Sequence, residues 1–486
     1  MGSINILQEL YTGFLRTHTF LIVVIFLFIG ILLEVSFSIS LLVTVGGLFL
    51  LTAFLISLKN LRAGLLLLLI IAPFSNIISQ VLPIGFLGGA ELGIGAVLRD
   101  ILLLFILMGW FFRVAMKDEA RVCIPLKYPI IYMCIIALFI LIAPDKMTAV
   151  LGFRNTAFYI VILYLTANIF STKQQIKRAM TIIIVLGGLL AIFGLLQLLT
   201  NGALLMRLGF EHGVGGALVY YAGVTRATAG VDNPLVFGIY MVMLILIASS
   251  LWLSTKKKSV LLLVLIFLMI TALVFTFTRS AVFALIGSIP FIGIFLKRYK
   301  LIGGLVLILS GILMFSVLFP NSIIVQRFFS QDEVSKRVIT IRLTQPKRAL
   351  QLLKEKPLLG IGLGTQGAAK ARFVRGLTPG VITDNYYFQI LTEMGMIGLA
   401  TYILLLFFLL KKAMSIYHSL TNIYLKSLAL GIVGIIFAMT IMNFGASTFD
   451  SRILNIYFWF FMGILLSLRK AEAVSLSERK IIKGVV

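Results

Sequence analysis

Charged side chains are scarce in this 486-residue chain: they make up 12% of it, with 17 Asp and Glu against 42 Lys and Arg. A soluble globular protein carries roughly 25% charged residues, so the deficit excludes an ordinary soluble chain. In place of charge, 60% of the residues are hydrophobic. They form repeated apolar runs of about 20 residues, the length that a helix needs to cross a hydrocarbon core about 30 Å thick. We therefore predict an all-α polytopic membrane protein.

Cysteine and histidine are also rare, with 2 Cys and 3 His. Two cysteines, Cys123 and Cys134, cannot form a disulfide framework. The histidines are scattered as His18, His212 and His418, and none has a second metal ligand at a usable spacing. The chain also lacks an Asp-x-Asp motif, which would hold a divalent metal beside a sugar nucleotide, and a Gly-x-Ser-x-Gly nucleophile elbow. We expect neither a metal nor a cofactor.

The apolar runs predict about fourteen membrane spans, and their lengths are compatible with about 12 to 14. Lys and Arg gather on every second loop and in the C-terminal tail. Because cytoplasmic loops of membrane proteins are enriched in these residues, we place both termini in the cytosol. Basic loops beside anionic lipid also explain the net charge of +25 without a nucleic acid partner. The predicted spans are 19–37, 39–57, 63–83, 95–115, 128–144, 149–170, 179–199, 235–254, 259–277, 280–296, 301–319, 386–410, 427–446 and 452–468.

The same alternation places two longer polar loops on the outer side, 200–234 and 320–385. The stretch 319–387 holds eleven Lys and Arg against four Asp and Glu. Long loops are translocated largely regardless of their charge, so a basic loop is permitted outside. The cause that we favour for it is an anionic ligand on the outer face.

A short helix is predicted inside the basic loop. Thr344 and Pro346 are typical of a helix start, and an apolar stripe follows them. This amphipathic helix either lies among lipid headgroups or packs in water on the bundle. The chain then divides into N-terminal transmembrane helices (1–148), core transmembrane helices with the first outer loop (149–319), the extracytoplasmic basic loop (320–385), and C-terminal transmembrane helices with a cytosolic tail (386–486).

Four arginines lie near membrane depth or in the first outer loop, namely Arg99, Arg154, Arg226 and Arg279. A cation within a bilayer costs several kcal/mol unless it is paired or faces a polar cavity. Arg99 could simply pair with Asp100 or Glu91. For Arg226 and Arg279 we favour a ligand role, because guanidinium groups bind phosphate oxygens in a bidentate way and several can share one diphosphate.

Asp384 is one of few acids on the outer side, and it stands just before the run 386–410. Its carboxylate could act as a general base toward a hydroxyl, or it could cap the helix that follows. The glycine-rich stretch 360–364 is similar to a phosphate loop but lacks the Walker lysine. We expect a tight turn with a close backbone approach there instead of a nucleotide site.

Four motifs occur in order along the chain: Arg-Ala-Thr-Ala-Gly to Asn-Pro (226–234), Phe-Thr-Arg-Ser-Ala (277–281), Arg342 followed by Lys-Pro-Leu-Leu-Gly-Ile-Gly-Leu-Gly-Thr (356–365), and Asp-Asn-Tyr-Tyr to Glu-Met-Gly-Met-Ile-Gly (384–398). Together they resemble the O-antigen ligase/polymerase family over about residues 150–410. These are bacterial membrane glycosyltransferases of GT-C type. The resemblance implies a GT-C-like fold with one long outer loop in the bacterial cytoplasmic membrane. It also implies metal-independent, inverting transfer of an undecaprenyl-diphosphate-linked glycan to a sugar hydroxyl on the outer face.

By this resemblance Arg226 and Arg279 hold the diphosphate, Arg342 assists them, and Asp384 is the favoured base. Ligases of the family usually have His-Asn where this chain has Asp384-Asn385. Polymerases vary at this position, including those of teichuronic acid, so the sequence favours a polymerase. Further candidate substrate-binding residues are Arg348, Arg154, Asn385 and Tyr386.

The expected function is therefore polymerisation of lipid-linked repeat units into a surface polysaccharide of the teichuronic acid, capsule, exopolysaccharide or O-antigen type. One alternative is a ligase that transfers the finished glycan to an acceptor. Another is a flippase for the same lipid-linked sugars, although the internal repeats common in transporters are not evident here. The shape-determining peptidoglycan polymerases fit the motif order less well. Expected partners are the lipid-linked donor and acceptor and membrane lipids, and a flippase and a chain-length regulator are further candidates.

Overall fold

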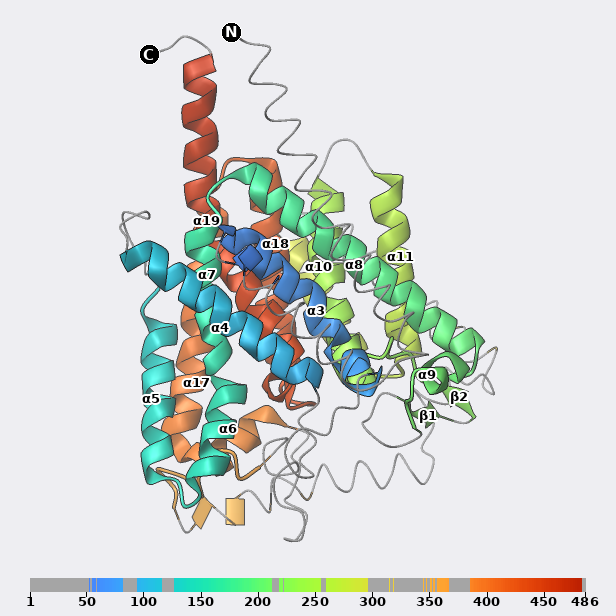
Figure 1. Cartoon of the computed structure of the whole chain (residues 1–486), viewed down its shortest axis with the longest axis vertical. Coiled ribbons are helices and arrows are strands. Elements are labelled where there is room, and N and C mark those ends of the chain that lie inside the picture. The colour runs from blue at the N-terminus through green and yellow to red at the C-terminus, as the bar shows by residue number, and fades with distance from the viewer. Residues whose placement is uncertain are drawn as a thin grey trace.

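The computed structural model describes residues 59–81, 94–115, 126–211, 218–221, 223–254, 259–295, 356–366 and 385–482, with isolated helical residues at 52–57 and 314–354. This part of the chain is almost entirely helical (Figure 1). Its helices are α3 (Leu61–Val81), α4 (Ile94–Ala115), α5 (Tyr128–Ile142), α6 (Lys146–Thr156), η1 (Phe158–Ile160), α7 (Val161–Ile169), α8 (Lys173–Leu199), α9 (Ala203–Arg207), α10 (Pro234–Ser254), α11 (Val260–Phe275), α12 (Arg279–Phe295), α17 (Tyr386–Ser419), α18 (Ile423–Met442), η2 (Thr448–Asp450) and α19 (Arg452–Ile482).

Among the described residues, eight helices are long and apolar enough to cross a membrane, and three shorter apolar helices accompany them. These correspond to predicted spans, so the all-α polytopic class is confirmed. The predicted spans 19–37, 39–57 and 301–319 lie outside the described residues apart from a few isolated positions. The total of fourteen therefore stays a prediction.

Several helices run beyond their predicted ends. α8 begins at Lys173, where Thr172 and Gln175 form a capping box, although its apolar run starts six residues later. α17 and α19 likewise continue into polar sequence. Lys, Arg, Glu and Gln are good helix formers, so the hydrogen-bond ladder continues where the apolar pattern stops. Hydropathy marks the membrane-buried part of a helix and not its end.

The centre of the bundle is formed by α10, α18 and α19. Of the most apolar 18 residues, 83% are buried in α10 and α19 and 78% in α18, but only 33% in α4. Tyr457 of α19 connects this centre to its neighbours, because its hydroxyl donates to the Leu69 carbonyl at 2.5 Å and lies 3.3 Å from the Tyr240 hydroxyl. Figure 1 shows α19 extending past the other helices at one end of the bundle.

The glycine-rich stretch closes against a break in α17. Gly395 has a φ of 62° inside that helix, so backbone groups around the break are available to other partners. The Ile361 N–H donates to the Thr392 carbonyl at 2.8 Å, and the Gly362 N–H donates to the Glu393 carbonyl at 3.1 Å. The Met396 N–H in turn donates to the Pro357 carbonyl at 3.0 Å. The predicted tight turn with a close backbone approach is thus confirmed.

Replacing Gly364 by Ala should destabilise the protein. Gly364 has a φ of +77°, and an added Cβ would lie 2.4 Å from the Thr148 carbonyl oxygen. The left-handed conformation alone costs a non-glycine residue roughly 1–3 kcal/mol, and backbone atoms cannot move aside as a side chain can. A lowered thermal unfolding midpoint in detergent would report this loss.

Gly223→Ala is the matched control for that substitution. Gly223 has a φ of +81° but nothing within 4 Å of the added Cβ, so it carries the conformational cost without the clash. Gly364→Ala should therefore have the lower midpoint of the two variants. Equal midpoints would contradict the described packing of the glycine-rich stretch on α6.

Candidate functional site

Residues 226–229 of the first predicted outer loop (200–234) are held by Gln197. This side chain is buried in the last turn of α8. Its Oε1 accepts from the backbone N–H groups of Thr228 at 3.0 Å and Ala229 at 3.1 Å, and its Nε2 donates to the Arg226 carbonyl at 2.9 Å. Sequence reasoning missed Gln197, whose only signal is a single amide within the apolar run that ends α8.

The same loop contains a small hairpin and then docks on the connection between α11 and α12. Strands β1 (Tyr220–Tyr221) and β2 (Val224–Thr225) pair antiparallel, with Tyr220 opposite Thr225. Just after the hairpin, the Ala227 N–H donates to the Phe275 carbonyl at 2.9 Å. In Figure 1 the hairpin and α9 lie toward the lower end of the bundle, away from the C-terminal end of α19.

Arg226 reaches the connection between α11 and α12 with its side chain. Its Nε donates to the Thr276 carbonyl at 2.8 Å, and its Nη2 lies 3.2 Å from Oγ1 of Thr278. The next residue, Arg279, is the first of α12. The structure thus places Arg226 against the turn that precedes Arg279, although 52 residues separate Arg226 from Thr278.

The start of α17 is connected to the same region. Asn385 is its N-cap: its Oδ1 accepts from the Phe388 N–H at 3.1 Å, and its Nδ2 donates to the Phe444 carbonyl at 3.1 Å. A Cβ added to Gly445 would lie 3.2 Å from the Cβ of Ser280, the second residue of α12. Asn385 therefore occupies the capping position that the sequence allowed for Asp384, and residues 444–445 connect it to the arginine turn.

The Tyr386 side chain is buried in the core and not exposed at the start of α17. The residue is 1% exposed, and its ring packs 5.3 Å from that of Tyr402 and 5.5 Å from that of Phe449, measured between centroids. Its backbone N–H donates to the Asn443 carbonyl at 2.9 Å. In this structure Tyr386 supports the start of α17 from below, and direct contact with a substrate stays a prediction.

Arg154 lies in an ion-pair network of its own. Its guanidinium contacts the carboxylate of Asp100, which also accepts from the Tyr159 hydroxyl at 2.8 Å. Arg99, which is 3% exposed, lies 3.6 Å from the same carboxylate, and its Nη1 donates to Oγ of Ser75 at 3.2 Å. The pairing of Arg99 with Asp100 is thus confirmed. The ion pair with Asp100 offsets the free-energy cost of placing the Arg154 cation at membrane depth, so no ligand is required for that purpose.

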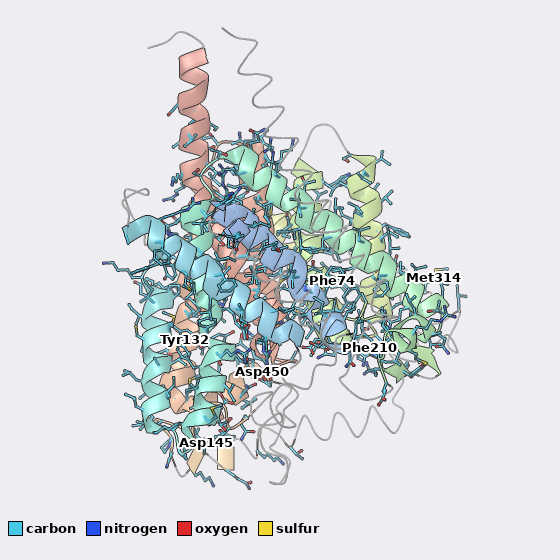
Figure 2. The ribbon with its side chains drawn as sticks, in the orientation of Figure 1. Phe74, Tyr132, Asp145, Phe210, Met314 and Asp450 are labelled. Atoms are coloured by element: carbon cyan, nitrogen blue, oxygen red, sulfur yellow. The ribbon has the colours of Figure 1, made fainter. Side chains whose placement is uncertain are left out.

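Two further acids, Glu393 and Asp450, accept hydrogen bonds near the break in α17. Glu393 is 3% exposed, and its Oε1 accepts from the Gln366 N–H at 2.9 Å. The Gln389 side chain donates to Oδ1 of Asp450 at 2.9 Å, and Figure 2 shows Asp450 inside the outline of the bundle. Within the described part of the chain, no group of three or more His, Cys, Asp and Glu residues could hold a metal ion.

Three of the predicted site residues, Asp384, Arg342 and Arg348, lie outside the described residues. Their roles stay predictions. The described site is therefore the arginine turn, formed by residues 226–229 and 275–280, together with the capped start of α17 beside it. Its chemistry is cationic, which suits a phosphate-bearing ligand.

Replacing Gln197 by Ala should loosen the arginine turn. The change removes the acceptor for two buried N–H groups, and each such loss costs roughly 1–3 kcal/mol. We expect a lower thermal unfolding midpoint, and an activity about tenfold lower for each 1.4 kcal/mol by which the loosened turn raises the activation barrier. The matched control is Gln174→Ala, which removes an exposed glutamine at the other end of the same helix. Equal effects of the two substitutions would contradict the organising role of Gln197.

This region of the chain is similar in sequence to known proteins. Residues 264–403 match the family model described as O-Antigen ligase. A Salmonella muenchen protein named "O-antigen polymerase" is 30% identical over 325 residues, which cover 63% of this chain and 79% of the relative. The match to the family model contains the turn with Arg279, the glycine-rich stretch and the start of α17.

Proposed function

Because this chain belongs to the O-antigen ligase/polymerase family, we propose that it joins undecaprenyl-diphosphate-linked oligosaccharide repeat units into a cell-surface polysaccharide. Its family makes it a membrane protein of polysaccharide assembly. The donor chemistry and the polymer are our proposal. The observation that carries it is the contact of Arg226 with the turn that directly precedes Arg279, next to the start of α17.

The proposed reaction is an inverting displacement at an anomeric carbon. The bond from that carbon to the diphosphate oxygen breaks, and the lipid diphosphate leaves with the electron pair. A hydroxyl of the acceptor sugar forms the new bond from the opposite face, and its proton goes to Asp384. Preorganised cations stabilise the charge that develops on the leaving group, so Arg279 and Arg342 are the proposed diphosphate ligands and no metal is needed.

We place this site on the outer face of the bacterial cytoplasmic membrane. Lys and Arg gather on every second loop and in the C-terminal part of α19, and the charge rule assigns both to the cytosol. The hairpin beside Arg226 lies toward the other end of the bundle (Figure 1). This placement puts the lipid-linked donor within reach after it has been flipped, and a flippase and a chain-length regulator are the proposed partners.

A ligase is the second candidate, because the matching family model carries that description. Two observations favour a polymerase. The relative named as a polymerase is matched over 79% of its length, and Asp384 stands where ligases of the family usually have histidine. The basic loop 320–385 would suit an acidic polymer such as teichuronic acid.

The function can be tested in a deletion strain by gel and mass analysis of its lipid-linked glycans and surface polysaccharide. A polymerase predicts that single repeat units remain while long chains disappear, and that the wild-type gene restores them. Long chains that stay on the lipid carrier would show a ligase. Repeat units trapped on the cytosolic side would show a flippase and contradict the proposal.

A further inference from the structure

The Arg226 guanidinium is already engaged by the protein. Two of its nitrogens contact the turn between α11 and α12, at the Thr276 carbonyl and the Thr278 hydroxyl. Both of these threonines are buried. The Arg226 backbone is held as well, since its N–H donates to the Val219 carbonyl at 2.8 Å and its carbonyl accepts from Gln197. Of the five N–H donors of this guanidinium, the Nε donor and one Nη2 donor are used on the turn, so this edge is not offered to phosphate oxygens.

The turn that Arg226 holds is strained. Phe277, at its centre, is fully buried and has a φ of +50°. A bulky residue with a positive φ is a genuine outlier, and such strain persists only where the surroundings impose it. The ring of Phe277 packs 5.7 Å from Tyr221 and 6.0 Å from Phe275, between centroids. Arg226 adds the polar contacts on either side of the strained residue.

The strained turn determines where α12 begins. Thr278 precedes the helix, and its carbonyl accepts from the Val282 N–H at 3.3 Å. Arg279 follows at once, so the direction of its Cα–Cβ bond depends on the conformation at 276–278. If the turn relaxed, Arg279 and the first N–H groups of α12 would point elsewhere.

We propose that Arg226 is a positioning residue: it clamps the strained turn at residues 276–278 and thereby aims Arg279 at the lipid diphosphate. The inference rests on the proposed function and divides the roles of the two arginines. Arg279 supplies charge to the ligand. Arg226 supplies hydrogen bonds to the protein.

Two substitutions of Arg226 separate hydrogen bonding from charge. In R226Q the amide nitrogen stands as many bonds from Cα as Nε does, so the bond to the Thr276 carbonyl can form without a charge. In R226K the positive charge is kept, but on an ammonium nitrogen that stands one bond farther from Cα than Nε and lacks the planar fork of the guanidinium. The clamp predicts that the thermal unfolding midpoint falls less in R226Q than in R226K and R226A. The opposite order would overturn the clamp.

Ligand binding then tests the positioning role. The probe is farnesyl diphosphate, a water-soluble isoprenyl diphosphate, titrated into the purified full chain in nanodiscs. R279A should weaken binding about tenfold or more, as expected for a lost charge-assisted contact, and R226Q should bind more tightly than R226K. R226A/R279A should bind about as weakly as R279A alone, because residues that act through one another are not additive.

The opposite pattern would overturn the inference. If R226K binds like the wild type while R226Q does not, Arg226 contributes its charge directly. Additive losses in the double variant lead to the same conclusion. Failure of the wild type to bind the probe would instead refute the proposed function and the positioning role with it, and the order of unfolding midpoints would still decide whether Arg226 clamps the turn.

Discussion

Replacing Arg279 by Ala is expected to abolish polymer formation, with a rate decrease of about 10²–10³. The physical reason is the charge on the departing lipid diphosphate, which a preorganised guanidinium stabilises in a site of low dielectric constant. Arg279 is the first residue of α12, directly after the turn that Arg226 contacts. The measurement is polymer length and yield in a deletion strain that expresses the variant, with membrane insertion verified by blotting.

Arg469→Ala is the matched control for that loss. Arg469 is an exposed arginine of α19, and it bonds to Ser415 and Ser419 near the far end of α17. The Arg469→Ala substitution removes one positive charge, as Arg279→Ala does, but far from the arginine turn. Polymer formation should therefore persist in this variant. We expect Arg342→Ala to resemble Arg279→Ala. Wild-type polymer in both would refute the proposed diphosphate site.

Replacing Asp384 by Asn is expected to decrease turnover by about 10²–10⁴, the usual contribution of a general base. The amide keeps the shape of the side chain but cannot accept the proton of the acceptor hydroxyl. Binding of the lipid-linked donor should change little, because the diphosphate contacts remain. Single-turnover kinetics with purified donor and acceptor would separate the two quantities.

Asn385→Ala tests whether position 384 matters through the helix start alone. Asn385 caps α17, and loss of a cap costs roughly 0.5–2 kcal/mol of stability. We expect its unfolding midpoint to fall through the lost cap, and any loss of turnover per folded molecule would report the substrate-binding role that the sequence predicts for Asn385. If Asp384→Asn shows the same fall in midpoint, with full turnover, the aspartate is not the base.

The arginine turn shows how far the sequence reaches into the site. The motifs around Arg226 and Arg279 indicated a shared site before any geometry was known. Which group each guanidinium contacts did not follow from the motifs. Arg226 and Thr278 lie 52 residues apart, and only the packing of helices brings them together.

The same limit applies to the other candidates. Arg154 has the sequence context of a ligand residue, but the fold places it against Asp100, 54 residues away. Tyr386 follows Asn385 in a motif, yet α17 turns its ring into the core. The glycine-rich stretch was the favourable case, because left-handed backbone and tight turns are local properties of glycine.

By itself, the sequence determined that this chain is a helical membrane protein and where its long apolar helices lie within the described residues. In hydrocarbon every backbone polar group must be satisfied within its own segment, so apolar length and charge spacing suffice. The tertiary structure alone decided the partners of the buried polar side chains. Those partners come from distant segments, and a polar group in an apolar interior binds whichever partner helix packing brings within reach.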